Sequence, residues 1–411
     1  MIPFEKFKLD NGLTVIVHED YTTPLVAMNI LYKVGARDEQ PDKTGFAHLF
    51  EHLMFGGSVN IEDFDEPLQK AGGENNAFTN NDITNYYLTI PAQNLETGFW
   101  LESDRMLSLA FTEKSLEVQR SVVVEEFKQR YLNQPYGDVW LQLRPLAYKV
   151  HPYQWATIGK EISHIEEATL EDVKSFFKKW YAPNNAILSI AGNCDLKSAK
   201  TLCEKWFAPI PAQHIPERKL PVEPEQKEKR ILELKRDVPN SRIYMAWHCC
   251  SRYDKEFYAT DLLSDILSRG KSSRLYQQLV KQNNYFTDIN AFMTGELDNS
   301  LLVIEGKLLN STDMDQAEKV ILEVVESVKQ GIEDRELQKV QHKAEATIEF
   351  SEMGIENKAL NLAYYELIGD AEECNRQAER YNAVTAQDII AIANKILTPN
   401  NCSILRYQSS H

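Results

Sequence analysis

The sequence predicts an α+β protein made of two similar domains. A chain of 411 residues is long enough for two domains of roughly 100–200 residues each. Apolar segments rich in β-branched residues, which favour strands, alternate with segments of helical periodicity. A helix, a Pro-Asn-Asn turn and an apolar strand also follow one another twice along the chain. These three observations together indicate a duplicated α+β unit.

The first half contains most of the segments whose type the residue pattern predicts. Strands are expected over the apolar, β-branched segments 12–18, 25–32, 84–90 and 186–191. Helices are expected over the periodic segments 44–54, 95–110, 113–132 and 170–180.

The repeat is in register at a spacing of 216 residues, the distance from Asp172 to Asp388. Eleven residues after each Asp stands a Pro-Asn-Asn sequence, at 183–185 and at 399–401. The same spacing aligns the strand at 25–32 with residues 241–248. Asp-capped helices before Pro-Asn-Asn turns are a common arrangement, but three matches in one register favour duplication.

Five prolines between 209 and 224 indicate a linker, because proline suits neither a helix interior nor a central strand. We therefore expect an N-terminal domain at 1–212, a linker at 213–230 and a homologous C-terminal domain at 231–411.

The composition restricts the class of partner. A net charge of −16 disfavours nucleic acid and anionic membranes and favours basic peptides. The six cysteines have irregular spacing, which indicates reduced thiols more than a disulfide framework. The N-terminus resembles no signal peptide, and no apolar run is long enough to span a membrane. A cytoplasmic location is expected.

The segment His48-Leu49-Phe50-Glu51-His52 lies in the expected helix 44–54. Residues four apart share one helix face, so His48 and His52 can bind one zinc ion. Glu51 lies beside them and is placed to act as a general base toward water. Two core histidines are the structural alternative, but apolar flanks make unpaired ionisable groups costly there.

A catalytic zinc usually has three protein ligands, so a further ligand is expected from another element. The expected helix 113–132 contains an apolar run followed by two carboxylates, Glu125 and Glu126. A solvated acidic face explains this pair equally well. The spacing alone does not choose between the two residues.

These motifs resemble the family of pitrilysin, insulin-degrading enzyme and mitochondrial processing peptidase. The resemblance runs over nearly the whole chain, and its combination of motifs is specific although each is weak alone. Beyond the histidine motif it is carried by residues 12–15, 45–55, 76–79, 122–126, 133–136, 151–153, 181–185 and 272–276. The short chain is similar to the branch that pairs two subunits of roughly 400 residues around a closed chamber.

The resemblance implies two domains, each a mixed, mostly antiparallel sheet with helices on one face, forming half of a clamshell. It implies that His48, His52 and Glu126 hold Zn²⁺ and that Glu51 is the base. It further implies that an extended peptide adds to a sheet edge formed by four residues. These residues are Asn76, Ala77, Phe78 and Thr79.

The sequence departs from the family pattern at two places. The family often has a Glu seven residues before the third ligand, where this chain has Gln119, which we expect beside the site. The family's substrate-binding Arg and Tyr correspond to Val280 and Thr287, and Tyr285 is a substitute only if the loop shifts. We therefore expect a heterodimer in which a homologous subunit without zinc supplies the Arg and Tyr.

The sequence thus favours a zinc-dependent endopeptidase subunit acting on short or unfolded peptides, basic ones among them. One alternative is a non-catalytic scaffold subunit with a relict metal site, as in the core proteins of the respiratory complex that resemble this family. Another is a small-molecule lyase with the same motif, such as the metal-dependent S-ribosylhomocysteine lyase. That lyase has a far shorter chain and no duplicated half.

Overall fold

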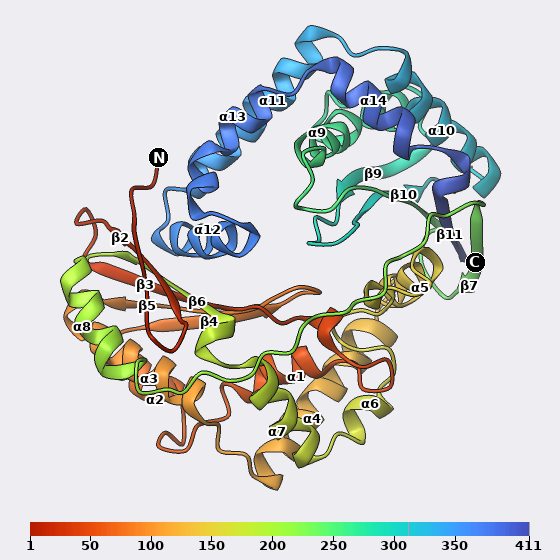
Figure 1. Ribbon diagram of the computed structural model, residues 1–411. Helices are drawn as coiled ribbons and strands as arrows, with labels where there is room; N and C mark the ends of the chain where they lie inside the picture. Colours follow the sequence, from red (N-terminus) through yellow and green to blue (C-terminus); the bar gives the residue numbers. More distant parts are fainter. Residues whose placement is uncertain (311, 411) are drawn as a thin grey trace. The chain divides into compact units, whose positions relative to one another are not determined.

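A computed structural model describes residues 1–310 and 312–410 (Figure 1). The chain forms two compact units, and each unit takes segments from both halves of the sequence. The first unit contains residues 1–130, 155–220 and 349–375. The second unit contains residues 131–154, 221–348 and 376–411, apart from the two positions not described.

The first unit has a six-stranded sheet in the order β1-β2-β6-β3-β5-β4. Only the β2–β6 pair is parallel, so the sheet is mixed and mostly antiparallel, as expected. Strand β4 forms one edge, which leaves its outer backbone groups without a strand partner in the described part of the chain. The strands are β1 Glu5–Lys8, β2 Thr14–Glu19, β3 Leu25–Tyr32, β4 Glu74–Thr79, β5 Thr84–Pro91 and β6 Ala186–Gly192.

Several helices of the first unit begin at side-chain caps that the sequence carries locally. The Thr112 hydroxyl accepts the Ser115 N–H at the start of α4, and Thr169 caps α7 in the same way. Most helices of the unit lie below the sheet in the view of Figure 1, and α8 lies at its left end. These helices are α1 Phe46–Leu53, α2 Asp65–Lys70, α3 Leu95–Leu107, α4 Glu113–Phe127, α6 Ser163–Glu166, α7 Leu170–Trp180 and α8 Leu196–Trp206.

One helix from the second half of the sequence, α12 (Ile355–Ile368), covers the opposite face of this sheet (Figure 1). It packs along β3 and β6, and its buried Leu362 and Ala363 join the apolar cluster on that face. Lys358 bonds Asp20 at 2.8 Å, and the Thr89 hydroxyl donates to Glu356 at 2.5 Å. The first sheet is therefore covered by helices on both faces.

The second unit has a five-stranded sheet in the order β7-β11-β8-β10-β9, in which only the β7–β11 pair is parallel. Strand β9 forms one edge of this sheet. The strands are β7 Arg230–Arg236, β8 Arg242–His248, β9 Phe286–Met293, β10 Leu301–Leu308 and β11 Cys402–Ser409.

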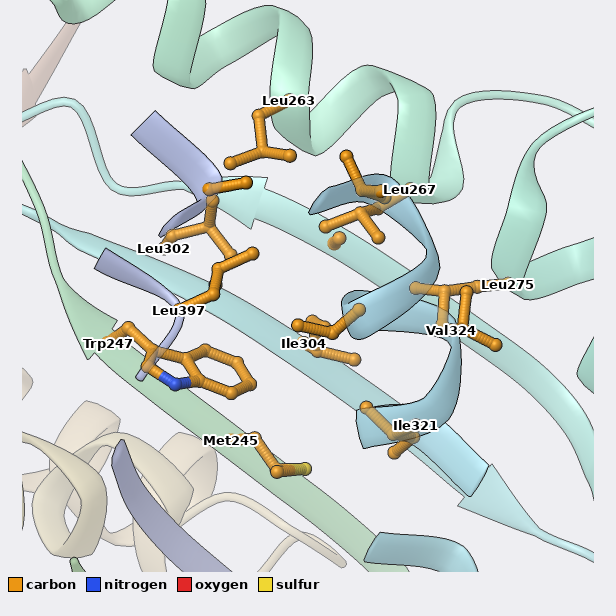
Figure 2. Packing of buried hydrophobic residues seen from close by; sticks show 14 of the residues in the cluster. Met245, Trp247, Leu263, Leu267, Leu275, Leu302, Ile304, Ile321, Val324 and Leu397 are labelled. Atoms are coloured by element: carbon orange, nitrogen blue, oxygen red, sulfur yellow. The ribbon is translucent and has the colours of Figure 1, made fainter. Parts of the chain in front are cut away.

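Most helices of the second unit cover one face of its sheet. Figure 2 shows the core beneath them, where Leu263 and Leu267 of α9 meet Leu302 and Ile304 of β10. Helix α5 lies on the other face, so helices again cover both sides. The helices are α5 Val139–Ala147, α9 Phe257–Ser268, α10 Met314–Gln330, α13 Gln377–Asn382 and α14 Ala386–Ile396, while α11 Asp334–Ser351 leads from this unit into the first.

The repeat seen in the sequence recurs in the structure. Helix α7, a Pro-Asn-Asn 3₁₀ turn and β6 follow one another in the first unit, and α14, the same turn and β11 do so in the second. Thr385 caps α14 as Thr169 caps α7. The compact units nevertheless do not follow the predicted continuous domains 1–212 and 231–411, because α5 and α12 have exchanged units. Helix α5 packs in an apolar cluster of the second unit and α12 in one of the first.

All six cysteines are free and buried, in agreement with reduced thiols. Among residues 1–310 and 312–410, no helix combines the length and the apolar character needed to cross a bilayer.

Candidate active site

Helix α1 presents the histidine motif because its apolar residues occupy the opposite face. The Phe50 ring lies 5.1 Å from the ring of Phe176 and 5.0 Å from that of Tyr181. This packing leaves His48, Glu51 and His52 on the face that is only partly covered. The buried residues of α1 are Phe46, Ala47, Leu49, Phe50 and Leu53.

The first turn of α1 is held by the buried carboxyl group of Glu39. Glu39 accepts hydrogen bonds from the backbone N–H groups of Gly45 and Ala47, both at 2.9 Å. Burial raises the pKa of Glu39 to about 8, although these donors oppose the shift. Gly45 has a φ of +89°, and a Cβ there would lie 2.7 Å from the carbonyl oxygen of Ile158. The entry to the motif helix is therefore fixed by two specific residues.

A second support reaches the middle of α1 from strand β5. The Tyr86 hydroxyl donates to the carbonyl of Phe50 at 3.2 Å. The guanidinium of Arg105 lies 4.4 Å from the centre of the Tyr86 ring and is paired with Glu102 of the same helix, α3. All three of these supporting side chains are fully buried. The contacts of Tyr86, Arg105 and Glu102 thus link the middle of α1 to β5 and α3.

Three side chains from α1 and α4 converge on one point. The Glu126 Oε2 atom lies 3.3 Å from His52 Nε2 and 3.6 Å from His48 Nε2. The three donor atoms all lie within 4.8 Å of one another. The side chains of His48, His52 and Glu126 are 13%, 25% and 16% exposed, so the cluster remains accessible from one side.

The protonation states of this cluster suit a metal ion. Burial lowers the pKa of His48, against the attraction of Glu126, so the imidazole is held neutral with a free lone pair. The interaction with His52 lowers the pKa of Glu126, which keeps its carboxylate charged. Two imidazoles and one carboxylate are a typical donor set for zinc. The residues present therefore fit that ion.

Glu51 lies outside this donor set. Burial raises its pKa, while the Thr79 hydroxyl and the neighbouring His52 oppose the increase. A carboxylate of raised pKa beside a metal site is a better proton acceptor than a fully solvated one.

The two carboxylates that the sequence left undecided differ in their surroundings. Glu125 is 60% exposed and pairs with Lys128 at 2.8 Å, whereas Glu126 lies with the histidines. Gln119 is half-buried on α4, two turns before Glu126.

The segment expected to bind substrate lies on the edge strand β4, which packs beside α1. Asn76 is exposed, and its Oδ1 accepts the N–H of Ala77 at 2.8 Å. The Phe78 ring packs partly against the apolar cluster under α12. The backbone of residues 76–79 thus lies at an open edge, while the side chain of Phe78 has a packing role.

The positions that correspond to the family's Arg and Tyr present no such group. Val280 and Tyr285 both pack against the core of the second unit. Thr287 is exposed on β9, and its hydroxyl donates to the Lys307 carbonyl at 3.3 Å.

Two residues around the cluster were missed by the sequence analysis. Arg130 contacts Glu126 at 2.7 Å from the following helical turn. The i,i+4 spacing of this pair is a signal that could have found it. Glu39 lies in a loop ahead of α1, and no local pattern in the sequence identifies it.

Comparison with known proteins places this geometry in context. Residues 14–157 match the family model described as Insulinase (Peptidase family M16), and residues 167–344 match Peptidase M16 inactive domain. The zinc protease PqqE of Helicobacter pylori is 28% identical over 400 residues, covering 95% of this chain and 89% of the relative.

Solved structures show the same fold. The crystal structure of a protease from Helicobacter pylori matches with a TM-score of 0.93 and 27% identity, covering 99% of this chain and 100% of that one. The periplasmic protease PqqL from Escherichia coli matches with a TM-score of 0.81 at 18% identity. That match covers 98% of this chain but 47% of PqqL, whose chain is about twice as long.

Proposed function

This chain belongs to the M16 peptidase family, and on that premise we propose that it is the zinc-bearing subunit of an endopeptidase that cleaves short or unfolded peptides. One observation carries the proposal. His48, His52 and Glu126 converge within 4.8 Å beside a carboxylate, Glu51, that is not needed to hold the ion.

In this proposal His48, His52 and Glu126 hold Zn²⁺. Zinc, when bound, supplies a Lewis acid that polarises water and the substrate carbonyl. Glu51 accepts the proton of the attacking water and passes it to the leaving amine. Its half-buried position limits competing solvation and keeps its basicity raised.

Strand β4 provides the binding surface for the substrate backbone. An extended peptide adds to an open sheet edge through main-chain hydrogen bonds, which do not depend on its side chains. The Asn76 side chain must release the Ala77 N–H as the peptide binds. The added segment must be extended and free to pair with β4 along its length, which short or unfolded peptides allow, so these are the expected substrates. The net charge of −16 favours basic ones.

The partner in this proposal is a homologous subunit without zinc, giving a heterodimer. The match to PqqL covers 47% of that chain, so PqqL has about as much chain again outside the matched part. Val280 and Thr287 are neither Arg nor Tyr, and Tyr285 packs against the core of the second unit without an accompanying Arg, so this chain offers no Arg–Tyr pair there. The partner would supply this pair. We also propose a cytoplasmic location for this chain, in contrast to PqqL, which is periplasmic.

The competing function is a scaffold subunit with a relict site. It draws support from the family model that matches residues 167–344, which is described as an inactive domain. That model covers mainly the second half, whereas the proposed ligands and base all lie between residues 48 and 126.

The test is zinc content by elemental analysis, measured together with cleavage of a quenched basic peptide. We expect one zinc per chain in the wild type, loss of zinc in Glu126→Gln, and retention in the control Glu125→Gln. Cleavage only when a candidate partner is added would support the shared site. Carefully prepared wild type without zinc would favour the scaffold function, and full activity of the chain alone would remove the need for a partner.

A further inference from the structure

Arg130 contacts the carboxylate of Glu126 from the side opposite the histidines. Its Nη1 lies 2.7 Å from Glu126 Oε1, while Glu126 Oε2 lies 3.3 Å from His52 Nε2 and 3.6 Å from His48 Nε2. The two oxygens of one carboxylate are thus divided between the guanidinium and the histidine pair.

The position of Arg130 follows from the way α4 ends. Helix α4 stops at Phe127 and continues as one wide π-helical segment, Lys128–Leu132. Arg130 lies in this segment, four residues after Glu126, and reaches back over the preceding turn. Its side chain is 69% exposed, whereas that of Glu126 is 16% exposed.

An exposed ion pair on a helix usually contributes little to folding. The effect of this pair on the carboxylate is different, because an ionised acceptor forms a strong and directional hydrogen bond with a guanidinium. A Glu126 carboxylate held by Oε1 cannot rotate freely, so Oε2 stays directed at the histidines.

We propose that Arg130 is a positioning residue that holds Oε1 of Glu126 and thereby makes Oε2 the single oxygen directed at the metal. This inference rests on the proposed zinc site and adds an outer contact to it. Outer contacts that orient a metal ligand typically change metal affinity about 10- to 100-fold. Loss of Arg130 therefore weakens zinc binding without weakening the fold.

The chain offers a matched control in Lys128. Lys128 lies two residues from Arg130 and pairs with Glu125 at 2.8 Å, away from the histidines. Arg130→Ala and Lys128→Ala remove the same charge from the same segment, so long-range electrostatic effects are similar in the two variants. Only the first variant frees Oε1 of the proposed ligand.

The experiment measures zinc affinity by competition with a chromogenic chelator, using the full chain and its two variants. We expect Arg130→Ala to bind zinc about tenfold more weakly than wild type, with Lys128→Ala unchanged. Arg130→Lys, which keeps the charge but not the planar fork, should lie between them. The visible absorption of the Co²⁺ forms should change in Arg130→Ala only, and the metal-free proteins should unfold at the same temperature.

Equal zinc affinity in Arg130→Ala and Lys128→Ala would overturn the inference and leave the zinc site intact. A metal-free Arg130→Ala that unfolds at a lower temperature than the control would also overturn it, because the residue would then only support the helix end. Wild type that binds no zinc would instead overturn the proposed function itself, and this inference with it.

Discussion

The two units contain corresponding helices, α1 and α9, and corresponding edge strands, β4 and β9, but among residues 1–310 and 312–410 the candidate metal ligands all lie in the first unit. In the first unit α1 presents His48, Glu51 and His52 beside β4. The residues 216 positions later, on α9, are Ser264, Leu267 and Ser268. Leu267 is fully buried in the core of the second unit (Figure 2). The helix face that is left partly open in one unit is thus packed in the other.

The edge strands β4 and β9 also differ in how a neighbouring helix bonds their backbone groups. The Ser268 hydroxyl accepts the N–H of Ala291 at 2.6 Å and donates to the carbonyl of Ala291 at 2.9 Å. Helix α9 thereby bonds both backbone groups of Ala291 on β9, whereas on β4 the Ala77 N–H is bonded by the side chain of the neighbouring Asn76. Under the proposed function, the peptide would add to the edge whose own helix does not bond to it. This comparison leads to four predictions.

The largest expected effect concerns the base in the first unit. Glu51→Gln keeps the three proposed ligands and removes only the proton acceptor. We expect it to bind zinc normally and to lose about 10²- to 10⁴-fold in peptide turnover, measured under the conditions in which wild type is active. Glu125→Gln is the control on the exposed carboxylate and should retain activity. Unchanged turnover in Glu51→Gln would mean that the base is wrongly assigned.

In the second unit, a substitution at the corresponding position, Leu267, should lower the stability of the fold and not the activity. Leu267→Ala leaves a cavity in a closely packed core and should lower the free energy of unfolding by about 2–5 kcal/mol. Glu51→Ala, at the partly open position of the first unit, should cost much less. Denaturant unfolding of the two variants measures this difference. Similar costs would show that the two helices are packed alike and contradict the comparison.

Glu39 holds the first turn of α1, and its burial predicts a pH dependence of stability. The equivalent position in the second unit is Lys255, which is not a carboxyl group. Burial raises the pKa of Glu39 from 4.5 to about 8, so the folded state binds a proton that the unfolded state has released. Stability should therefore fall between about pH 5 and pH 8, by at most about 1.4 kcal/mol per pH unit. Glu39→Gln should have a flatter profile in thermal unfolding, and parallel profiles would contradict the assignment.

The smallest expected effect is at the edge of β9. Ser268→Ala removes both hydrogen bonds to Ala291 and should lower the stability by about 1 kcal/mol. Amide hydrogen exchange of Ala291 should accelerate in this variant, since its N–H becomes free. Ser251→Ala is a suitable control, because this hydroxyl lies in a surface turn and donates to Asp254. Slow exchange of Ala291 in Ser268→Ala would show that something else protects this edge.

The sequence predicted much of the local structure. The helix at 170–180 and the strands at 25–32, 84–90 and 186–191 agree with α7, β3, β5 and β6 to within a residue. The helix predicted at 113–132 is α4 followed by the π-helical segment. These features depend on residues close together in the chain, namely caps, side-chain periodicity and turns. The same short-range logic placed His48, Glu51 and His52 on one helix face.

Non-local packing decided the rest. Glu125 and Glu126 are equivalent in sequence, and only the position of α4 against α1 directs Glu126 to the histidines. Tertiary packing likewise brings Glu39 from its loop to the first turn of α1. The exchange of α5 and α12 between units was not predicted, because a helical pattern shows that an apolar face must be buried but not which sheet buries it. The sequence by itself determined the elements and the chemistry of the motif, and the tertiary structure decided which elements meet.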